Sequence, residues 1–161
     1  MTTTHRTASS EELRSLPGYA LAQAFRIMRH ALDAALRDIG LTTPQWGTLK
    51  CIAEHEEISG AEMARLHHLT PQTMNTILQN LEHADLIRRE HHPAHGTVLV
   101  IKLTETGWER LDEAVGRVLA VQDQMLSDFS LEERDLLLSL LNRCVAALTR
   151  DGPPEGFCPA V

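Results

Sequence analysis

The chain of 161 residues has few cysteines, few aromatic residues and no long apolar run. Its three cysteines, Cys51, Cys144 and Cys158, are widely spaced without a CxxC pair, which indicates neither a zinc site nor a disulfide framework. No stretch reaches transmembrane length and the N-terminus has no apolar segment, so we expect no signal peptide, no membrane partner and a cytoplasmic location. The motifs HExxH, GxGxxG, GxSxG and the P-loop are absent, so the sequence predicts neither an enzyme nor a cofactor.

Positive charge is also scarce in this sequence. There are 15 lysines and arginines against 22 aspartates and glutamates, and the formal net charge is −7. Proteins that bind nucleic acid usually rely on lysine and arginine to neutralise phosphates. Acidic side chains outnumber basic ones within residues 40–104 as well, although most of the histidines lie there. Any DNA binding by this chain therefore depends on few cations, with histidine as a conditional supplement.

The sequence does contain two closely spaced helix starts. Ser59 followed by Glu62 is a capping box, in which the two side chains satisfy free main-chain N–H groups. Thr70 followed by Pro71 is a second start, with an N-cap and a proline at the first helical position. Two helices this close together predict a helix-turn-helix, whose second helix can enter a DNA major groove. Thr43, also followed by a proline, predicts an earlier helix start.

Two strand-like segments follow the predicted second helix. They occupy residues 86–89 and 98–103, and the residues between them, 91–96, are rich in turn formers. A helix-turn-helix followed by a β-hairpin is a winged helix. We therefore predict a mainly α protein that reads DNA, with a winged helix-turn-helix over residues 41–104 and a small β-hairpin as its wing.

The predicted recognition helix has one polar and one apolar side. Side chains on the polar side can exchange hydrogen bonds with base edges, which is how sequence is read in the major groove. Arginines at the base of the wing and in the preceding helix are candidates for phosphate contacts, and the histidine-rich turn of the wing lies near the expected DNA backbone. The predicted DNA-binding residues are Arg65, Gln72, Thr73, Asn75, Thr76, Gln79, Arg88, Arg89 and His95.

Long helices are predicted on both sides of this region, at residues 16–40 and 105–150, whereas residues 1–15 and 151–161 are expected to be flexible. Between residues 111 and 129, apolar positions alternate at four and three residues, as coiled-coil packing requires. The last helix is too apolar to face water on any broad side. Because a winged-helix core is too small to cover these helices, they predict a homodimer that reads two half-sites of an inverted repeat.

Four segments, in this order and at this spacing, resemble the MarR family of bacterial transcriptional regulators. They are LTTPQW at residues 41–46, LTPQT at 69–73, LEHADLIRR at 81–89 and LTETG at 103–107. The resemblance covers about residues 16–150 and implies a dimer with a winged helix-turn-helix in each lobe, acting as a repressor. The chain departs from the family in its wing, where Thr97 stands at a position that is often arginine.

The resemblance also implies a small effector, often an aromatic acid, that binds between the dimerisation and DNA-binding regions and releases the DNA. An arginine or lysine can hold a carboxylate there while an aromatic side chain stacks on the ring. The candidate effector-binding residues are Gln23, Arg26, Ile27, His30, Trp46 and Lys50. An aromatic side chain placed as Trp46 is more often part of the core.

Two other interpretations remain open from the sequence. The first is a metal- or redox-responsive regulator of the same fold, because imidazole groups at His67, His68 and within residues 91–95 suit zinc or nickel. None of them forms an i, i+4 pair on a predicted helix, as a compact site of that kind requires, so no metal ligand is assigned, and Cys51 is expected to be buried and unreactive. The second is a winged helix used only for protein assembly, which the acidic balance and the missing wing arginine favour.

Overall fold

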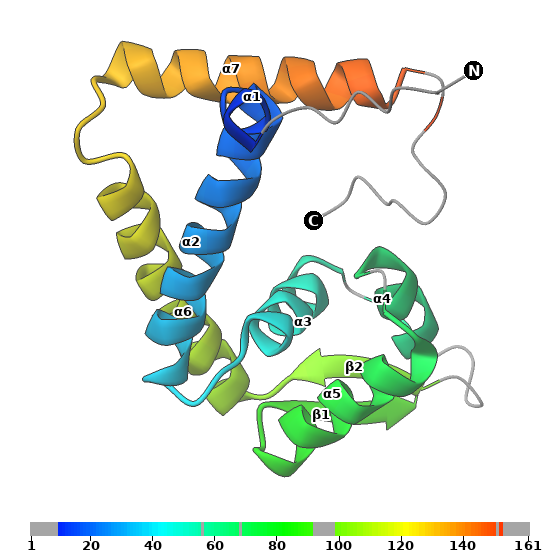
Figure 1. Ribbon diagram of the computed structural model, residues 1–161. Coiled ribbons are helices and arrows are strands. Elements are labelled where there is room, and N and C mark those ends of the chain that lie inside the picture. The colour runs from blue at the N-terminus through cyan, green and yellow to red at the C-terminus, as the bar shows by residue number, and fades with distance from the viewer. Residues whose placement is uncertain (1–9, 56, 68, 92–98, 151, 153–161) are drawn as a thin grey trace.

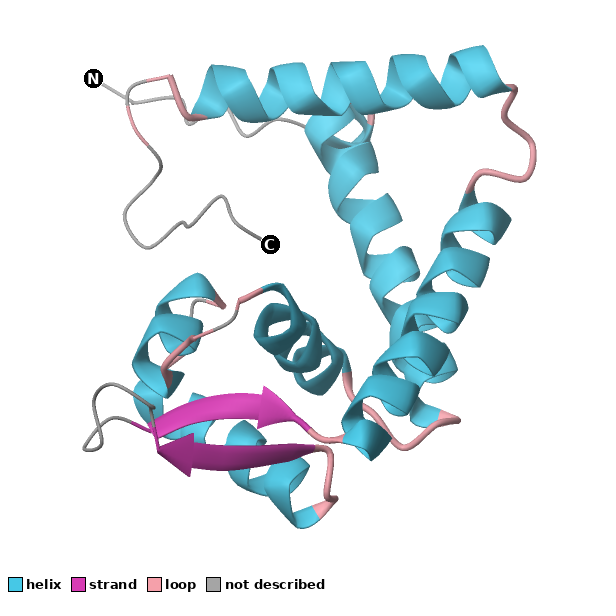
Figure 2. Ribbon diagram, turned by 180° about the vertical axis from the view of Figure 1, so that it is seen from behind, coloured by secondary structure: helices cyan, strands magenta, loops and turns pink. Residues whose placement is uncertain are grey.

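The computed structural model describes residues 10–55, 57–67, 69–91, 99–150 and 152. The described part is mainly helical with one two-stranded antiparallel sheet, as the sequence predicts (Figures 1 and 2). In chain order the elements are α1 (Ser10–Arg14), α2 (Pro17–Arg37), α3 (Thr43–Glu54), α4 (Gly60–Leu66), α5 (Pro71–His83), β1 (Ile87–His91), β2 (Leu99–Leu103), α6 (Glu105–Met125) and α7 (Leu131–Leu148). Within these ranges, no helix combines the length and the apolar character needed to cross a bilayer.

Helices α3, α4 and α5 and the β1–β2 hairpin form one lobe, which confirms the predicted winged helix-turn-helix (Figure 1). The two strands pair with Ile87 opposite Leu103 and with Arg89 opposite Ile101. The lobe encloses a core that also receives the last turn of α2 and the first turns of α6. Its fully buried large side chains are Leu36, Thr48, Leu49, Met63, Met74, Leu81 and Ile87. Burying each large aliphatic side chain contributes about 1.5–3 kcal/mol, so this cluster holds the recognition elements in place.

Outside the lobe, α2 and α6 lie side by side and α7 turns away from them, so the three helices form an open triangular frame (Figures 1 and 2). No residue of α7 is buried in the single chain. Leu131, Leu138 and Leu148 are 75%, 60% and 79% exposed. The frame therefore carries apolar side chains that its own chain leaves uncovered.

The N-cap of α3 lies one residue before the predicted position. Thr42, rather than Thr43, makes the capping box: its hydroxyl accepts from the N–H of Gln45 at 3.4 Å, and its own N–H donates to the Gln45 side chain at 2.9 Å. The hydroxyl of Thr43 donates instead to the carboxylate of Asp33 in α2. Thr43 is thus used to join two helices, which leaves the capping role to its neighbour.

Two predictions about the frame are corrected. Residues 10–14, expected to be flexible, form α1, and the hydroxyl of Ser15 donates to the carbonyl of Glu12 at 2.8 Å at its end. The predicted seam does not continue to Phe129, because α6 ends at Met125 and Phe129 follows in the turn before α7. Of the predicted seam, Leu111 is buried in the core of its own chain and Val118 packs against that core, whereas Val115 is exposed.

Candidate nucleic-acid interface

Capping interactions fix the two helices of the helix-turn-helix. The Ser59 hydroxyl accepts from the N–H of Glu62 at 3.2 Å, and the Glu62 carboxylate accepts from the hydroxyl and the N–H of Ser59 at 2.7 and 3.0 Å. The hydrogen bond from the Ser59 side chain, followed by that from its main chain, lowers the pKa of Glu62. The Thr70 hydroxyl accepts from the N–H of Thr73 at 3.1 Å, so both predicted helix starts are confirmed.

Helix α5 turns an apolar side to the core and a polar side to solvent. Met74, Leu78 and Leu81 are buried on the inner side. The five polar residues predicted to contact bases are all exposed: Gln72, Thr73, Asn75, Thr76 and Gln79. The structure therefore presents the predicted reading surface as one exposed face of a single helix.

The most outward part of that face is a line of side chains along α5. With about 100° of rotation per residue, Gln72, Thr76 and Gln79 lie opposite the buried side, and the exposed His83 continues the line one turn further. Asn75 lies to one flank. The sequence prediction omitted His83, although its spacing of four residues from Gln79 was the available signal.

Hydrogen bonds distinguish the engaged groups on α5 from the available ones. The Thr73 hydroxyl lies 2.8 Å from that of Thr70, and the Thr76 hydroxyl donates to the main-chain carbonyl of Gln72 at 3.1 Å. Among the described residues, none bonds to the side-chain amides of Gln72 and Gln79. An amide can pair at two points with adenine in the major groove, so these are the two groups best suited to read bases.

Arg88 and Arg89, predicted together as phosphate ligands, lie on opposite faces of the hairpin because side chains alternate along a strand. Arg89 lies on the α5 side, with its Nε 3.2 Å from the Glu82 carboxylate. Arg88 lies on the other face, with its Nε 2.6 Å from the Glu90 carboxylate. The two arginines do not share one surface, and of the two only Arg89 lies beside the recognition helix.

The cations of the hairpin base are all paired with carboxylates. Besides Arg88 and Arg89, Lys102 lies 3.8 Å from Glu90 and directly across the sheet from Arg88. These side chains are partly exposed, and exposed ion pairs contribute about 0–1 kcal/mol each. A DNA phosphate can therefore compete for the same cations.

The remaining predicted DNA contacts lie in different places. Arg65 is exposed in the last turn of α4. His95 lies outside the described residues, as do His68 and His92.

Within the described ranges, no three His, Cys, Asp or Glu side chains are grouped so as to hold a metal ion.

Cys51 of α3 is buried in the core. Burial, and after it the charge of Glu54, raises the pKa of this thiol. The reactive thiolate form is therefore disfavoured at neutral pH. His55, the next residue along this side of the helix, directs its Nδ1 to the main-chain carbonyl of Cys51 at 2.8 Å.

The candidate effector-binding residues lie on two helices that contact each other, α2 and α3. The four on α2 are exposed: Gln23, Arg26, Ile27 and His30. On α3, the Lys50 ammonium lies 3.0 Å from the carboxylate of Glu54. Trp46 packs against the core, as expected for an aromatic side chain in its position, and its indole Nε1 is enclosed without a hydrogen-bond partner among the described residues.

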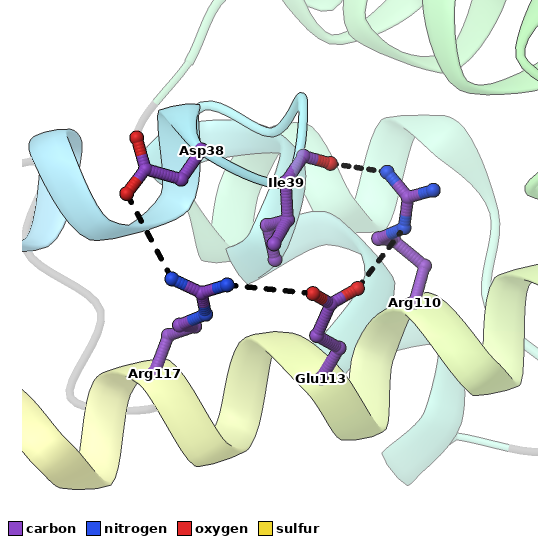
Figure 3. A network of polar contacts seen from close by, with 5 residues as sticks. All are labelled: Asp38, Ile39, Arg110, Glu113 and Arg117. Atoms are coloured by element: carbon purple, nitrogen blue, oxygen red, sulfur yellow. Dashed lines mark hydrogen bonds and ion pairs between the residues drawn. The ribbon is translucent and has the colours of Figure 1, made fainter.

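A polar network joins the frame to the lobe where α2 ends (Figure 3). Arg110 of α6 donates from Nη1 to the main-chain carbonyl of Ile39. Arg117, two turns further along α6, lies 3.8 Å from the carboxylate of Asp38. Glu113 lies between them, 3.8 Å from the Arg110 Nε and 3.6 Å from the Arg117 Nη2. The network thus connects the last residues before the lobe to one face of α6.

The hairpin and the exposed helix of the lobe define a winged helix-turn-helix protein. Residues 41–95 match the family model described as the MarR family. The chain is also 34% identical over 110 residues to the HTH-type transcriptional repressor Rv2887 of Mycobacterium tuberculosis strain H37Rv, which covers 68% of this chain and 79% of that relative. The chain belongs to the MarR family, which confirms the resemblance seen in its sequence.

Solved structures agree with this assignment. The crystal structure of the Mycobacterium tuberculosis MarR family protein Rv2887 in complex with DNA has a TM-score of 0.69 and 28% sequence identity, covering 81% of this chain and 98% of that chain. The same protein in complex with salicylic acid has a TM-score of 0.67 and 29% identity, covering 81% and 96% of the two chains. The similarity therefore extends over the frame as well as the lobe.

Proposed function

We propose that this chain is a transcriptional repressor that binds an inverted repeat in double-stranded DNA as a homodimer and is released by a small aromatic carboxylate. The observation that carries the proposal is the outward line of α5, where the amides of Gln72 and Gln79 are exposed and engaged by no described residue. A rigid, capped helix with available amides is suited to base recognition in the major groove.

The shortage of cations bears on how such a protein binds. With a net charge of −7, long-range attraction to DNA is weak, so affinity has to come from contacts made at the correct sequence. Arg89, beside the recognition helix, and Arg65, on α4, are the cations best placed for phosphates near that helix. The proposed DNA-binding residues are Arg65, Gln72, Thr73, Asn75, Thr76, Gln79, His83, Arg89 and His95, with a smaller contribution from Arg88 on the opposite face of the hairpin.

The frame supports a homodimer. Leu131, Leu138 and Val145 repeat at intervals of seven residues along α7 and are at least half exposed. A second copy of the chain would cover this apolar line, and burial contributes about 25 cal/mol for each Å² of apolar surface. Two-fold pairing would also place two recognition helices on one side of the DNA, as an inverted repeat requires.

The proposal of an aromatic carboxylate as effector rests on a solved structure of the relative Rv2887 and on the side chain of Trp46. Rv2887 has been solved with salicylic acid, an aromatic carboxylate. In this chain the enclosed indole N–H of Trp46 lacks an acceptor among the described residues, and a buried donor without a partner costs free energy that a bound oxygen would restore. The proposed effector-binding residues are Gln23, Arg26, Ile27, His30, Trp46 and Lys50.

The proposed role involves no catalysis, in keeping with relatives that are named as transcriptional regulators. Access to a bacterial chromosome places such a regulator in the cytoplasm.

One observation favours a second candidate, a module for protein assembly without DNA binding: Arg88, Arg89 and Lys102 are all paired with carboxylates.

Selection of bound sequences from random DNA at low salt tests the proposal. The expected result is an inverted repeat, bound at least a thousandfold more tightly than random DNA. Gln72→Ala and Gln79→Ala should each weaken operator binding by about 1–3 kcal/mol, whereas the control Gln124→Ala on α6 should not. Absence of any enriched sequence would reject the repressor and favour the assembly module.

Two further measurements test the assembly and the effector. Sedimentation should give a dimer for the wild type and a monomer for the double variant Leu138→Asp, Val145→Asp. Adding salicylate should release the operator from the wild type, and Trp46→Phe, which removes the N–H and keeps an aromatic ring, should respond less. A wild-type monomer at micromolar concentration would contradict the homodimer.

A further inference from the structure

The chain passes between frame and lobe twice, and the two crossings differ in how they are held. At the second crossing, the Thr104 hydroxyl donates to the carbonyl of Asp85 at 2.6 Å, and its N–H donates to the carbonyl of Leu86 at 3.1 Å. Gly107, in the first turn of α6, packs directly against the Leu86 carbonyl. The start of α6 is therefore bound tightly to the base of the hairpin.

The first crossing is held by the hydrogen bond from Thr43 to Asp33 and by side chains from α6. After α2 ends, Gly40 has a positive φ of 73°, which turns the chain toward α3. Just before it, the carbonyl of Ile39 accepts from Arg110, and Asp38 pairs with Arg117 (Figure 3). These are contacts between α6 and the end of α2, so they join the two crossings to each other.

Glu113 connects the contacts of Arg110 to those of Arg117. Arg110 and Arg117 are seven residues apart, so both lie on the same face of α6, and the carboxylate of Glu113 lies between the two like charges. The side chains of the three residues are 36%, 42% and 48% exposed, and that of Asp38 is 71% exposed. Exposed ion pairs of this kind add little to folding stability. We therefore expect them to affect the angle between lobe and frame more than the free energy of unfolding.

We propose that Arg110 is a positioning residue that, with Glu113 and Arg117, fixes the angle between lobe and frame. In a homodimer this angle sets the separation of the two recognition helices, and so the spacing of half-sites that the protein accepts. The inference rests on the proposed function, because it concerns the geometry of a DNA-binding dimer. It assigns spacing selectivity to a junction that lies away from the recognition helix.

Because of the geometry of DNA, a change in the spacing of half-sites is a sensitive test of the proposal. Adding one base pair between half-sites moves one of them by about 3.4 Å along the axis and turns it by about 34°. A dimer with a fixed angle discriminates against that change, whereas one with a loose junction tolerates it. Loss of the Arg110 contacts should therefore reduce discrimination between spacings more than it reduces affinity for the best spacing.

The first test compares operators with one base pair added or removed between half-sites. Arg110→Met keeps much of the stem of the side chain and removes the charge and the donors, and Arg37→Met, in the last turn of α2 outside the network, is the control. The ratio of affinities for the best and altered spacings should fall at least threefold in Arg110→Met and stay unchanged in Arg37→Met. An unchanged ratio in Arg110→Met would overturn the proposal.

A measurement without DNA separates this inference from the proposed function. A spin label at His83→Cys, with Cys144→Ser and Cys158→Ser, reports the distance between the two recognition helices of a dimer. The distance distribution should be narrow in the parent chain, broader with Arg110→Met and unaffected by Arg37→Met. A distribution that Arg110→Met leaves unchanged overturns the inference while leaving the repressor proposal intact, and a parent chain without dipolar coupling contradicts both.

Discussion

Arg89 of β1 and Glu82 of α5 form an ion pair, with Nε 3.2 Å from the carboxylate, that joins the base of the wing to the flank of the recognition helix. Asn75 lies on the same flank and shares with Arg89 a cavity of about 280 Å³. The position of Arg89 is thus set relative to the helix that would read bases. Arg88, its neighbour in sequence, faces the other side of the hairpin and has no such relation to α5.

This difference predicts unequal effects on the salt dependence of DNA binding. Arg89→Met removes one phosphate contact per subunit, so the slope of log K against log[salt] should become shallower by about 1.8 for a dimer. Arg88→Met removes the same charge from the opposite face and should change the slope much less. The measurement is a salt titration of operator affinity, and equal changes in the two variants would show that the face of the hairpin does not matter.

A second prediction concerns Asn75. Its side chain is exposed on the flank of α5 beside Arg89, where it can contact a base edge. Asn75→Ala should weaken operator binding by about 1–3 kcal/mol and leave binding to random DNA nearly unchanged. Asn80→Ala, an exposed asparagine on another side of the same helix, is the matched control. Equal losses on operator and random DNA would mean that Asn75 only positions the helix.

A third prediction follows from the capping box of α4. The pKa of Glu62 is lowered by hydrogen bonds from Ser59, so its contribution to stability is present above the ordinary pKa of a glutamate and is lost as pH falls through the lowered value. Ser59→Ala should cost about 0.5–2 kcal/mol at pH 7 through loss of the cap. Thermal unfolding should show a smaller difference between variant and wild type at pH 3.5, which is below the ordinary pKa of a glutamate.

The control for this prediction is Glu62→Gln, which keeps an acceptor at the same position but does not titrate. In that background the effect of Ser59→Ala should vary less between pH 7 and pH 3.5. An effect that is the same at both pH values in the wild-type background would show that the charge of Glu62 adds nothing to the cap.

A fourth prediction separates the cysteines. Burial raises the pKa of Cys51, whereas Cys144 is exposed on α7. With iodoacetamide at pH 7.5, mass spectrometry of the folded protein should find Cys144 modified well before Cys51, and mild oxidation should leave operator binding to a Cys144→Ser, Cys158→Ser variant unchanged. Rapid modification of Cys51 would revive the redox-responsive interpretation.

The sequence predicted most of what local chemistry determines. Ser59 and Thr70 were identified as caps from their neighbours alone, and the two sides of α5 followed from helical periodicity. The same local reasoning was wrong by one residue at the start of α3, where it predicted Thr43 as the cap and Thr42 fills that role. What decided between them was Asp33, which engages Thr43 from another helix.

Contacts between segments far apart in the chain could not be predicted from the sequence. Arg110 and Ile39 are 71 residues apart, and no pattern along the chain indicates that an arginine in α6 donates to the carbonyl at the end of α2. The opposite faces of Arg88 and Arg89 were deducible from strand alternation, which also puts Arg88 and Glu90 on one face, but the partner Glu82 required the packing of the hairpin on α5.

Gly107 has a consequence for how this protein can change over time. A Cβ at that position would overlap the carbonyl oxygen of Leu86, so even alanine requires the backbone of the hairpin or of α6 to shift. Position 107 is therefore restricted to glycine, whereas insertions or deletions between β1 and β2 do not affect this contact. Sequence changes in the wing can therefore occur without changing how the base of the hairpin is attached to α6. New operator preferences can arise in this way while the lobe keeps the same position relative to the frame.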